Sequence, residues 1–144
     1  MNGLTAFIAL DGATLAFDKL YTYLVPQSLE TVALAGCRVT VPFGGGNVKK
    51  QGMIFRTENA ETDGLKPILS VTDAKPVLSA EMLKMCEYMH ESCFCTYFDA
   101  VHAILPAGLN YKLINYYSAN TDFTVMRLLD DTENKVYSYL AENG

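Results

Sequence analysis

The sequence has no tryptophan, and its 144 residues include only four cysteines, five prolines and two histidines. The cysteines do not form two paired motifs, so neither a disulfide framework nor a four-ligand zinc site is indicated. The one close pair is Cys93-x-Cys95, and His90 and His102 do not complete a ligand set around it. We therefore expect no metal site, with the histidines packed or at a rim and the cysteines serving as small buried side chains. The four cysteines are Cys37, Cys86, Cys93 and Cys95.

Long apolar runs are also missing. No stretch approaches the ~20 apolar residues of a membrane helix. The start, Met1-Asn2-Gly3-Leu4, has no basic region ahead of an apolar one, as a secretory leader would. These absences predict a cytoplasmic protein with no membrane contact.

Positive charge is scarce. The net charge is −5, from 11 Lys and Arg against 16 Asp and Glu, and the whole of the acidic excess lies after residue 75. Nucleic-acid-binding domains usually carry a strong basic stripe, so charge alone does not identify one here. The strand-like runs of the first half contain a few cations, namely Arg38, Lys49, Lys50, Arg56 and Lys66.

The first half contains short β-rich runs that Pro or Gly terminates, which is typical of strands joined by turns. We expect strands at residues 5–10, 21–25, 37–41, 50–57 and 66–71. In the second of these, alternation places Tyr21, Tyr23 and Val25 on one face and Thr22 and Leu24 on the other.

The glycine run Gly44-Gly45-Gly46-Asn47 stands between two of these strands and precedes Lys49 and Lys50. A phosphate-binding loop needs a glycine directly before its lysine and a Ser or Thr after it, and this run has neither. A hairpin connection is therefore the expected structure. No nucleophile elbow, zinc-binding helix or Ser/His/Asp arrangement is present, so we expect no enzymatic activity from this chain.

The pattern becomes helical after Pro76. Ser79 is a suitable N-cap for a helix ending near His90, and Thr96 with Asp99 resembles a capping box for a helix over 97–105. Met82, Met85 and Met89 lie at helical spacing and are expected in the core, with a partner-binding face as the alternative. Further on we expect a strand over 123–128 and a helix capped by Asp131 or Thr132.

Together these elements predict an α+β fold, in which a small antiparallel β-sheet or barrel is followed by two helices. We expect one domain over residues 1–107 and a separate segment over 108–144.

Several runs, in order and at matching intervals, resemble the N-terminal domain of the primosomal replication-restart helicases, the PriA family. They are Tyr23-Leu24-Val25-Pro26, Gly36-Cys37-Arg38-Val39-Thr40-Val41-Pro42-Phe43-Gly44, Leu65-Lys66-Pro67 and Ala103-Ile104-Leu105-Pro106. The resemblance implies a DNA-binding module that recognises the 3′-hydroxyl end of the nascent leading strand at a stalled fork. It also implies that residues 108–144 are a linker and the first element of a truncated winged-helix domain.

The resemblance further implies a 3′-end pocket at Tyr21, Thr22, Gly44 and Lys66, to which we add Tyr23 from the same strand. A tyrosine can stack on the terminal base, a glycine permits close approach, and a lysine can meet the last phosphate. Thr22 stands where the family has an aspartate, so we expect a weaker, uncharged acceptor for the 3′-hydroxyl. The candidates for contacts with the DNA backbone are Arg38, Lys49 and Lys50.

The family's helicase motor, with its ATP, Mg²⁺ and zinc sites, would lie outside this chain, so no cofactor is expected here. The implied partners are fork DNA with a free 3′ end, the remaining domains of the helicase and other primosome proteins. A different class of function stays open on the residues alone, namely a small β-barrel module that binds a protein or RNA.

Overall fold

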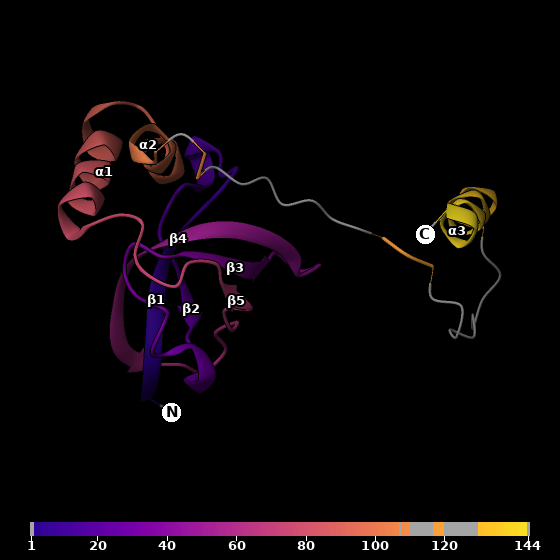
Figure 1. The fold of residues 1–144 in the computed structure, drawn as a ribbon, viewed down its shortest axis with the longest axis horizontal. Helices are drawn as coiled ribbons and strands as arrows, with labels where there is room; N and C mark the ends of the chain where they lie inside the picture. Colours follow the sequence, from indigo (N-terminus) through magenta and orange to yellow (C-terminus); the bar gives the residue numbers. More distant parts are fainter. Residues whose placement is uncertain (1, 107, 110–116, 120–129, 144) are drawn as a thin grey trace. The chain divides into compact units, whose positions relative to one another are not determined.

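The computed structural model describes residues 2–106, 108–109, 117–119 and 130–143 (Figure 1). The chain forms two compact units, residues 1–111 and 112–144, and each is described here by itself. Among the described residues, the first unit contains five strands and two α-helices, and the second contains the helix α3 (Asp131–Asn143). The first unit therefore has the expected α+β fold.

The five strands form one antiparallel sheet in the order β2-β1-β4-β3-β5. Both central strands are longer than expected, because β4 pairs with β1 over one part of its length and with β3 over another. The polar end of β4 shows no apolar alternation, so the sequence pattern could not reveal that it pairs there. The strands are β1 (Asn2–Leu10), β2 (Tyr21–Leu24), β3 (Arg38–Phe43), β4 (Val48–Glu61) and β5 (Ser70–Val71).

The sheet is not closed into a barrel, although its two edges approach each other. The strand expected over 66–71 is reduced to the two residues of β5, and the segment before it pairs with β2 through a single parallel bridge, Leu24 to Pro67. The amide of Leu24 donates to the carbonyl of Lys66 at 3.0 Å, and the amide of Ile68 donates to the carbonyl of Leu24 at 2.9 Å. Pro67 has no amide hydrogen, and this bridge does not require one.

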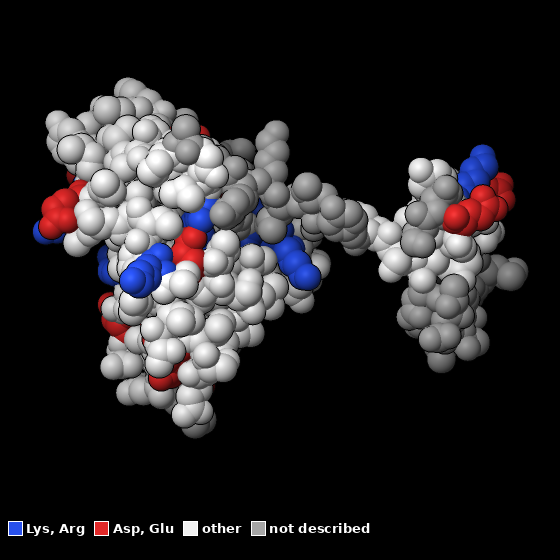
Figure 2. Space-filling view, viewed as in Figure 1, with Lys and Arg blue, Asp and Glu red and all other residues white. Residues whose placement is uncertain are grey.

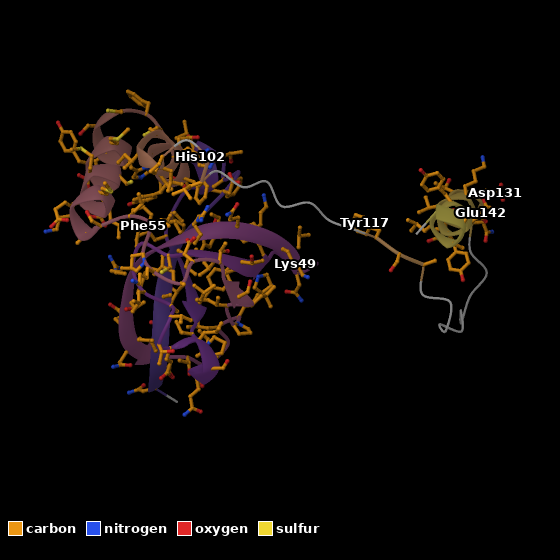
Figure 3. The ribbon with its side chains drawn as sticks, viewed as in Figure 1. Lys49, Phe55, His102, Tyr117, Asp131 and Glu142 are labelled. Atoms are coloured by element: carbon orange, nitrogen blue, oxygen red, sulfur yellow. The ribbon has the colours of Figure 1, made fainter. Side chains whose placement is uncertain are left out.

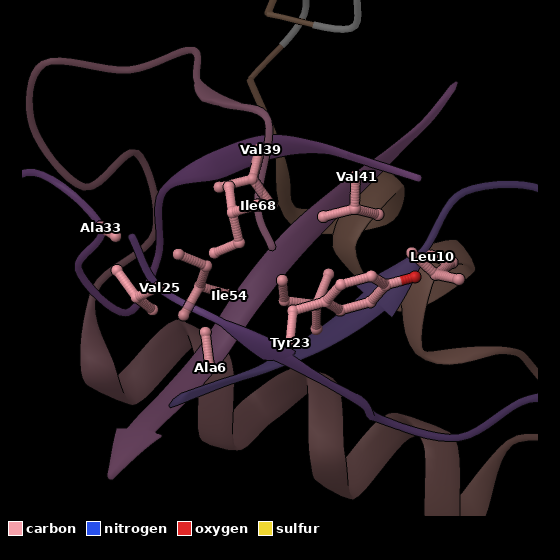
Figure 4. Packing of buried hydrophobic residues seen from close by; sticks show 10 residues of the cluster. Ala6, Leu10, Tyr23, Val25, Ala33, Val39, Val41, Ile54 and Ile68 are labelled. Atoms are coloured by element: carbon pink, nitrogen blue, oxygen red, sulfur yellow. The ribbon is translucent and has the colours of Figure 1, made fainter. Parts of the chain in front are cut away.

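Two hydrophobic clusters pack on opposite faces of the sheet. One lies on the face that curls toward the segment before β5 (Figure 4). The other lies between the opposite face and the helices. Period-two alternation along β4 divides its side chains between them, with Ile54 in the first cluster and Met53 and Phe55 in the second. The residues drawn in Figure 4 include Ala6, Leu10, Tyr23, Val25, Ala33, Val39, Val41, Ile54 and Ile68.

The two helices of the first unit begin at the predicted caps and pack against each other (Figure 1). The Ser79 hydroxyl accepts a hydrogen bond from the amide of Met82 at the start of α1 (Ala80–Ser92). At the start of α2 (Tyr97–Ile104), Thr96 and Asp99 form a reciprocal capping box with two bonds of 3.0 Å. Both capping predictions are confirmed.

The cap of α3 is one residue earlier than predicted. Oδ1 of Asp130 accepts from the amides of Thr132 and Glu133 at 2.8 Å, and the Glu133 carboxylate accepts from the amide of Asp130 at 3.0 Å. Asp130 rather than Asp131 or Thr132 therefore caps the helix, because only its carboxylate precedes the amides of the first turn. The strand expected over 123–128 lies outside the described residues.

The predicted methionine core of α1 is wrong at two of its three positions. Met82 and Met85 are 43% and 53% exposed, whereas Leu83 and Cys86 are buried and Met89 is packed beside them. The buried side of the helix carries Leu83 and Cys86, each one position after an exposed methionine, and this side faces the sheet.

The cysteines also divide between buried and accessible positions. All four are free thiols; Cys37 and Cys86 are buried as expected, but Cys93 is exposed and Cys95 half-buried. In the described part of the chain no three His, Cys, Asp or Glu side chains converge as metal ligands would, and none of its helices is long and apolar enough to span a membrane.

Candidate functional site

One pocket of about 220 Å³ brings together the residues that the resemblance pointed to. Three stretches of the first unit line it: β2, the end of β3 with the first residue of the hairpin, and the loop before the Pro67 bridge. Tyr21, Thr22, Tyr23, Gly44 and Lys66 all belong to this lining. The remaining lining residues, which the sequence reasoning missed, are Pro42, Phe43, Gly64 and Leu65.

The pocket forms because β2 is an edge strand. Within the described part of the chain its only ladder partner is β1, so the opposite edge is left to the Leu24–Pro67 bridge, which places Lys66 beside it. Thr22 also belongs to the lining, although its side chain alternates with those of the two tyrosines along β2.

A tight turn places the end of β3 at the pocket. Gly44 has φ +69°, a left-handed conformation that glycine adopts without a steric penalty, and its carbonyl accepts from the amide of Asn47 at 3.2 Å. Asn47 is itself left-handed, with φ +50°, as asparagine tolerates. The glycine run is thus a hairpin connection between β3 and β4, as predicted.

The aromatic wall of the pocket is held from two sides. The ring of Tyr21 meets the ring of Phe43 edge to face, with centroids 5.2 Å apart and planes at 85°. The Tyr21 hydroxyl donates to the carbonyl of Phe17 at 2.7 Å, and the Lys19 ammonium lies 5.1 Å from the Tyr21 ring centroid. This ring is therefore fixed before any ligand arrives, which favours stacking at low entropic cost.

Tyr23 lines the pocket from inside the hydrophobic core. Its side chain is only 4% exposed, and its hydroxyl donates to the carbonyl of Pro42 at 3.1 Å. Burial, together with the neighbouring Tyr21, raises the pKa of Tyr23, so its hydroxyl stays protonated as that donor requires. Tyr23 therefore lines the pocket with a buried ring that supports the wall, and its part in binding a DNA end stays a prediction.

The Lys66 side chain joins the bridge segment beside β2 to the hairpin connection. Its ammonium donates to the carbonyl of Gly44 at 2.6 Å and to Oδ1 of Asn47 at 2.7 Å. An ammonium has three N–H donors, so one remains for a ligand. Asn47 was not predicted as a site residue, and its only signal in the sequence is its place at the end of the glycine run.

Arg38 does not reach a DNA backbone, and that expectation is corrected. Its side chain is 2% exposed, and its guanidinium binds the carboxylate of Asp73 through Nε at 2.9 Å and through Nη2. Nη1 binds the carbonyl of Leu109. Burial alone would raise the pKa of Asp73, but the hydrogen bonds and charge of Arg38 outweigh it, and the pKa lies below its ordinary value. The Arg38–Asp73 pair therefore contributes to the structure of the first unit and is not exposed for contact with DNA.

The other two candidate cations lie on β4. Lys49 is exposed near the hairpin end of the strand, far from Phe55, which packs toward the helices (Figure 3). It pairs with Pro42 in the ladder, so it lies close to the pocket lining. Lys50 is half-buried, and its ammonium contacts the carbonyl of Asp11 at 3.4 Å. Of the two, Lys49 is better placed for a phosphate.

The histidines contribute to packing between the helices and the sheet. His90 stacks on Tyr97 with centroids 3.8 Å apart, and its Nδ1 lies 2.9 Å from the carbonyl of Cys95 and 3.2 Å from the Asp18 carboxylate. His102 packs edge-on against Phe98 at an exposed position, at the rim of the helices (Figure 3). Neither histidine lines the pocket.

Charge is mixed on the surface around these elements. On the face drawn in Figure 2, basic and acidic side chains are interspersed, with no continuous basic stripe. A second hollow, of about 410 Å³, runs along α3 in the other unit and is mainly apolar. No basic side chain and none of the predicted site residues line it. The pocket at β2 is therefore the candidate site.

Comparisons with known proteins identify the family of the first unit. The family model of the 3′DNA-binding domain (3′BD) matches residues 8–106, which include every residue of the pocket. The chain is 26% identical over 145 residues to the replication restart protein PriA of Bacillus subtilis (strain 168); the alignment covers 96% of this chain and 18% of that protein. The chain thus spans less than a fifth of the length of this relative. It belongs to the family of PriA 3′DNA-binding domains.

Proposed function

We propose that the first unit binds the 3′ end of a DNA strand and that the pocket at β2 receives the terminal nucleotide. The observation that carries this proposal is the convergence of Tyr21, Thr22, Gly44 and Lys66 on one pocket, from stretches up to 45 positions apart in the sequence. Membership of the 3′DNA-binding domain family supports the choice of DNA over a protein or RNA partner.

The size of the pocket favours an end over the middle of a strand. Pockets that enclose a whole small molecule usually measure ~300–1,000 Å³. The pocket at β2, at about 220 Å³, holds one sugar or base with its terminal group. A continuous strand would need a groove lined with cations, and the face drawn in Figure 2 shows charges of both signs interspersed.

Each pocket residue has a chemical role in this proposal. The Tyr21 ring stacks on the terminal base, and the backbone at Gly44 permits close approach of the sugar. The remaining N–H of Lys66 donates to the last phosphate, and Lys49 adds a contact to the backbone further along. The Thr22 hydroxyl accepts from the 3′-hydroxyl as a neutral partner, where the family aspartate would be charged.

With so few cations, affinity is expected to be moderate, on the order of micromolar, and to weaken as salt rises. In the cell the domain would locate the end of the nascent leading strand at a stalled fork. A helicase motor elsewhere in the same protein, with its ATP, Mg²⁺ and zinc, would then act on the fork. Primosome proteins are the further partners in this proposal, and the chain itself would hydrolyse no ATP.

The test is fluorescence anisotropy with fork DNA whose leading strand ends in a 3′-hydroxyl or a 3′-phosphate. We expect tighter binding to the 3′-hydroxyl, because a phosphate would crowd a pocket of this size. Equal binding to both ends, and to a fork with no 3′ end at the junction, would contradict the proposal.

Two Thr22 variants test the terminal contact directly. Thr22→Val keeps the β-branched shape and removes the hydroxyl, so binding should weaken roughly two- to tenfold, as for one neutral hydrogen bond of about 0.5–1.5 kcal/mol. Thr22→Asp should widen the preference for a 3′-hydroxyl over a 3′-phosphate, because a charged acceptor binds the first more strongly and repels the second. If both variants stay folded and bind both ends like the parent, Thr22 has no part in the site.

A further inference from the structure

An exposed aromatic residue, Phe17, is joined through its backbone to a residue that lines the pocket. Phe17 ends the short turn Leu15–Phe17 that precedes β2, and its side chain is 72% exposed. It belongs to neither hydrophobic cluster. A phenylalanine so open to water gains little by burial, and its ring is accessible to a ligand.

The Tyr21 ring joins Phe17 to the pocket. One part of this ring lines the pocket, while its hydroxyl donates to the carbonyl of Phe17 at 2.7 Å. The Tyr21 side chain thus lies between the backbone of Phe17 and the pocket that would receive the terminal nucleotide. A strand that ends in the pocket continues over a neighbouring surface, and the link through Tyr21 makes Phe17 a candidate for contact with it.

A positive charge accompanies the aromatic ring. Lys19 lies between Phe17 and Tyr21 in the sequence and places its ammonium 5.1 Å from the Tyr21 ring centroid. A base-stacking ring beside a cation that can meet the sugar-phosphate backbone is the combination that single-strand-binding proteins use. A docking surface for an apolar protein segment would not require a cation beside the ring. The presence of Lys19 therefore favours a nucleic acid over a protein at this position.

We propose that Phe17 and Lys19 form a second nucleotide subsite, in which the Phe17 ring stacks on the penultimate base and the Lys19 ammonium meets the phosphate joining the last two nucleotides. The subsite rests on the proposed function, because it takes its ligand from the strand whose end the pocket holds. It extends recognition from one nucleotide to two, without sequence preference, since every base has a face to stack.

The test uses a 5′-labelled trideoxynucleotide with a 3′-hydroxyl, and the same molecule with an abasic penultimate position, in fluorescence anisotropy with the 144-residue chain. We expect the parent to bind the intact molecule at least about fivefold more tightly than the abasic one. Phe17→Ala should bind both molecules equally. Without the ring, the penultimate base of the intact molecule has no stacking partner, so its removal costs nothing further. A Phe17→Ala protein that keeps the parent's preference would overturn the proposal.

Phe94 provides the matched control. It is another phenylalanine, 98% exposed in the turn between α1 and α2, and it lines no part of the pocket. Phe94→Ala should retain the parent's preference for the intact molecule. If Phe94→Ala loses the preference as Phe17→Ala does, exposed rings bind DNA without a site and the proposal fails.

The role of Lys19 has its own test. Lys19→Gln should lower the slope of log affinity against log salt by about one, as for one phosphate contact. A neutral methylphosphonate between the last two nucleotides should lower the parent's slope equally and leave that of Lys19→Gln unchanged. A further drop in the variant would place Lys19 at another phosphate and overturn its assignment.

A spectroscopic readout follows from the absence of tryptophan in this chain. Phe17→Trp would introduce one indole at the subsite while keeping an aromatic face. Its fluorescence should be quenched by the intact trinucleotide and unchanged by the abasic one, and Phe94→Trp should respond to neither. Absence of quenching in Phe17→Trp would contradict stacking.

Comparing 3′-hydroxyl with 3′-phosphate forms of the trinucleotide separates the two proposals. If the parent discriminates between these ends but not between the intact and abasic penultimate positions, the subsite is refuted and the end-binding pocket stands. If it discriminates between neither pair, the proposed function itself fails.

Discussion

At the scale of single residues, the pocket depends on how one ammonium is held. Lys66 has two fixed partners, the Gly44 carbonyl and Oδ1 of Asn47, at 2.6 and 2.7 Å. Both belong to the hairpin connection, so the hairpin orients the last free N–H of the lysine. A donor oriented in advance binds its acceptor with less loss of rotamer entropy than a free lysine would.

We therefore predict that Asn47→Gly weakens binding to a 3′ end by roughly two- to tenfold, the value of one lost hydrogen bond. Glycine keeps the left-handed backbone of this position, so the hairpin should survive. The slope of log affinity against log salt should not change, because the charge of Lys66 remains. Lys66→Gln, by contrast, should lower that slope by about one.

Anisotropy titrations over a range of salt concentrations measure both quantities, with circular dichroism to verify folding. Unchanged affinity in Asn47→Gly would show that the lysine needs no positioning. A lowered slope would show that Asn47 acts on the charge itself.

Two residues in the motifs that match the family proved to be buried. Arg38, expected at the DNA backbone, pairs with Asp73, and Tyr23, which does line the pocket, donates its hydroxyl hydrogen to Pro42. A sequence shows that a residue type suits DNA, but it does not show what lies on the other side of the sheet. Gly44 and Lys66 were located correctly at the pocket because their matching runs are at its rim, whereas Phe43 and Asn47 were missed because only the turn geometry brings them there.

At the scale of elements, Gly36 joins the sheet to the helical layer. Its amide donates to the carbonyl of Ile54 at 2.8 Å, and its carbonyl accepts from the amides of Val77 at 2.9 Å and Leu78 at 3.3 Å. The position has φ +87°, and a Cβ there would lie 2.0 Å from the carbonyl oxygen of Leu78. The segment leading into α1 can approach β4 only where no side chain intervenes.

Gly36→Ala is therefore predicted to lower the free energy of unfolding by at least about 2 kcal/mol, from left-handed strain of about 1–2 kcal/mol and displacement of the Leu78 backbone. Gly45→Ala is the matched control, since nothing lies within 4 Å of a Cβ there and its φ is not left-handed. It should change stability by no more than about 0.5 kcal/mol. Urea unfolding measures both, and equal stabilities would refute the close approach.

Elements were predictable where the signal is local. The caps at Ser79 and Thr96 depend on residues three positions apart, and both were read correctly. Strand ends and β5 depend on which strand lies alongside, as β4 shows by extending beyond its apolar run to Glu61. The exposed Met82 and Met85 make the same point for α1: periodicity indicates a helix, but the packing partner determines which stripe is buried.

At the scale of the whole molecule, one ion pair ties the sheet to the chain beyond the helices. Arg38 on β3 binds Asp73 after β5 and also the carbonyl of Leu109, so a single side chain joins three stretches of the first unit. Breaking a buried pair of this kind usually costs about 3–5 kcal/mol, because the remaining charge is left without a partner.

Asp73→Asn should accordingly destabilise the first unit by about 3–5 kcal/mol at neutral pH. The double variant Arg38→Met with Asp73→Asn should lose much less, because it removes both charges while the amide oxygen still accepts from the backbone of residue 38. If the double variant is as unstable as the single one, lost packing rather than unpaired charge explains the effect.

The pair also makes a contribution to stability that acid removes. The pKa of Asp73 is lower in the folded protein than its ordinary value of about 3.9. The contribution is thus fully present above that value and disappears as the pH falls through the folded-state pKa. Below pH 4 the parent should lose stability more steeply than Asp73→Asn, and a parallel decline of both in urea titrations at several pH values would contradict this.

The pocket is assembled from residues 21–23, 42–44 and 64–66, which meet only when the sheet is complete. During synthesis the aromatic residues Tyr21 and Phe43 leave the ribosome before Lys66. Until Lys66 has been added, and in any product that ends before residue 66, the pocket would be incomplete and the domain would not bind a DNA end. Because only the folded domain has this pocket, a bound DNA end would stabilise the folded state. The melting temperature should then rise with the logarithm of the oligonucleotide concentration.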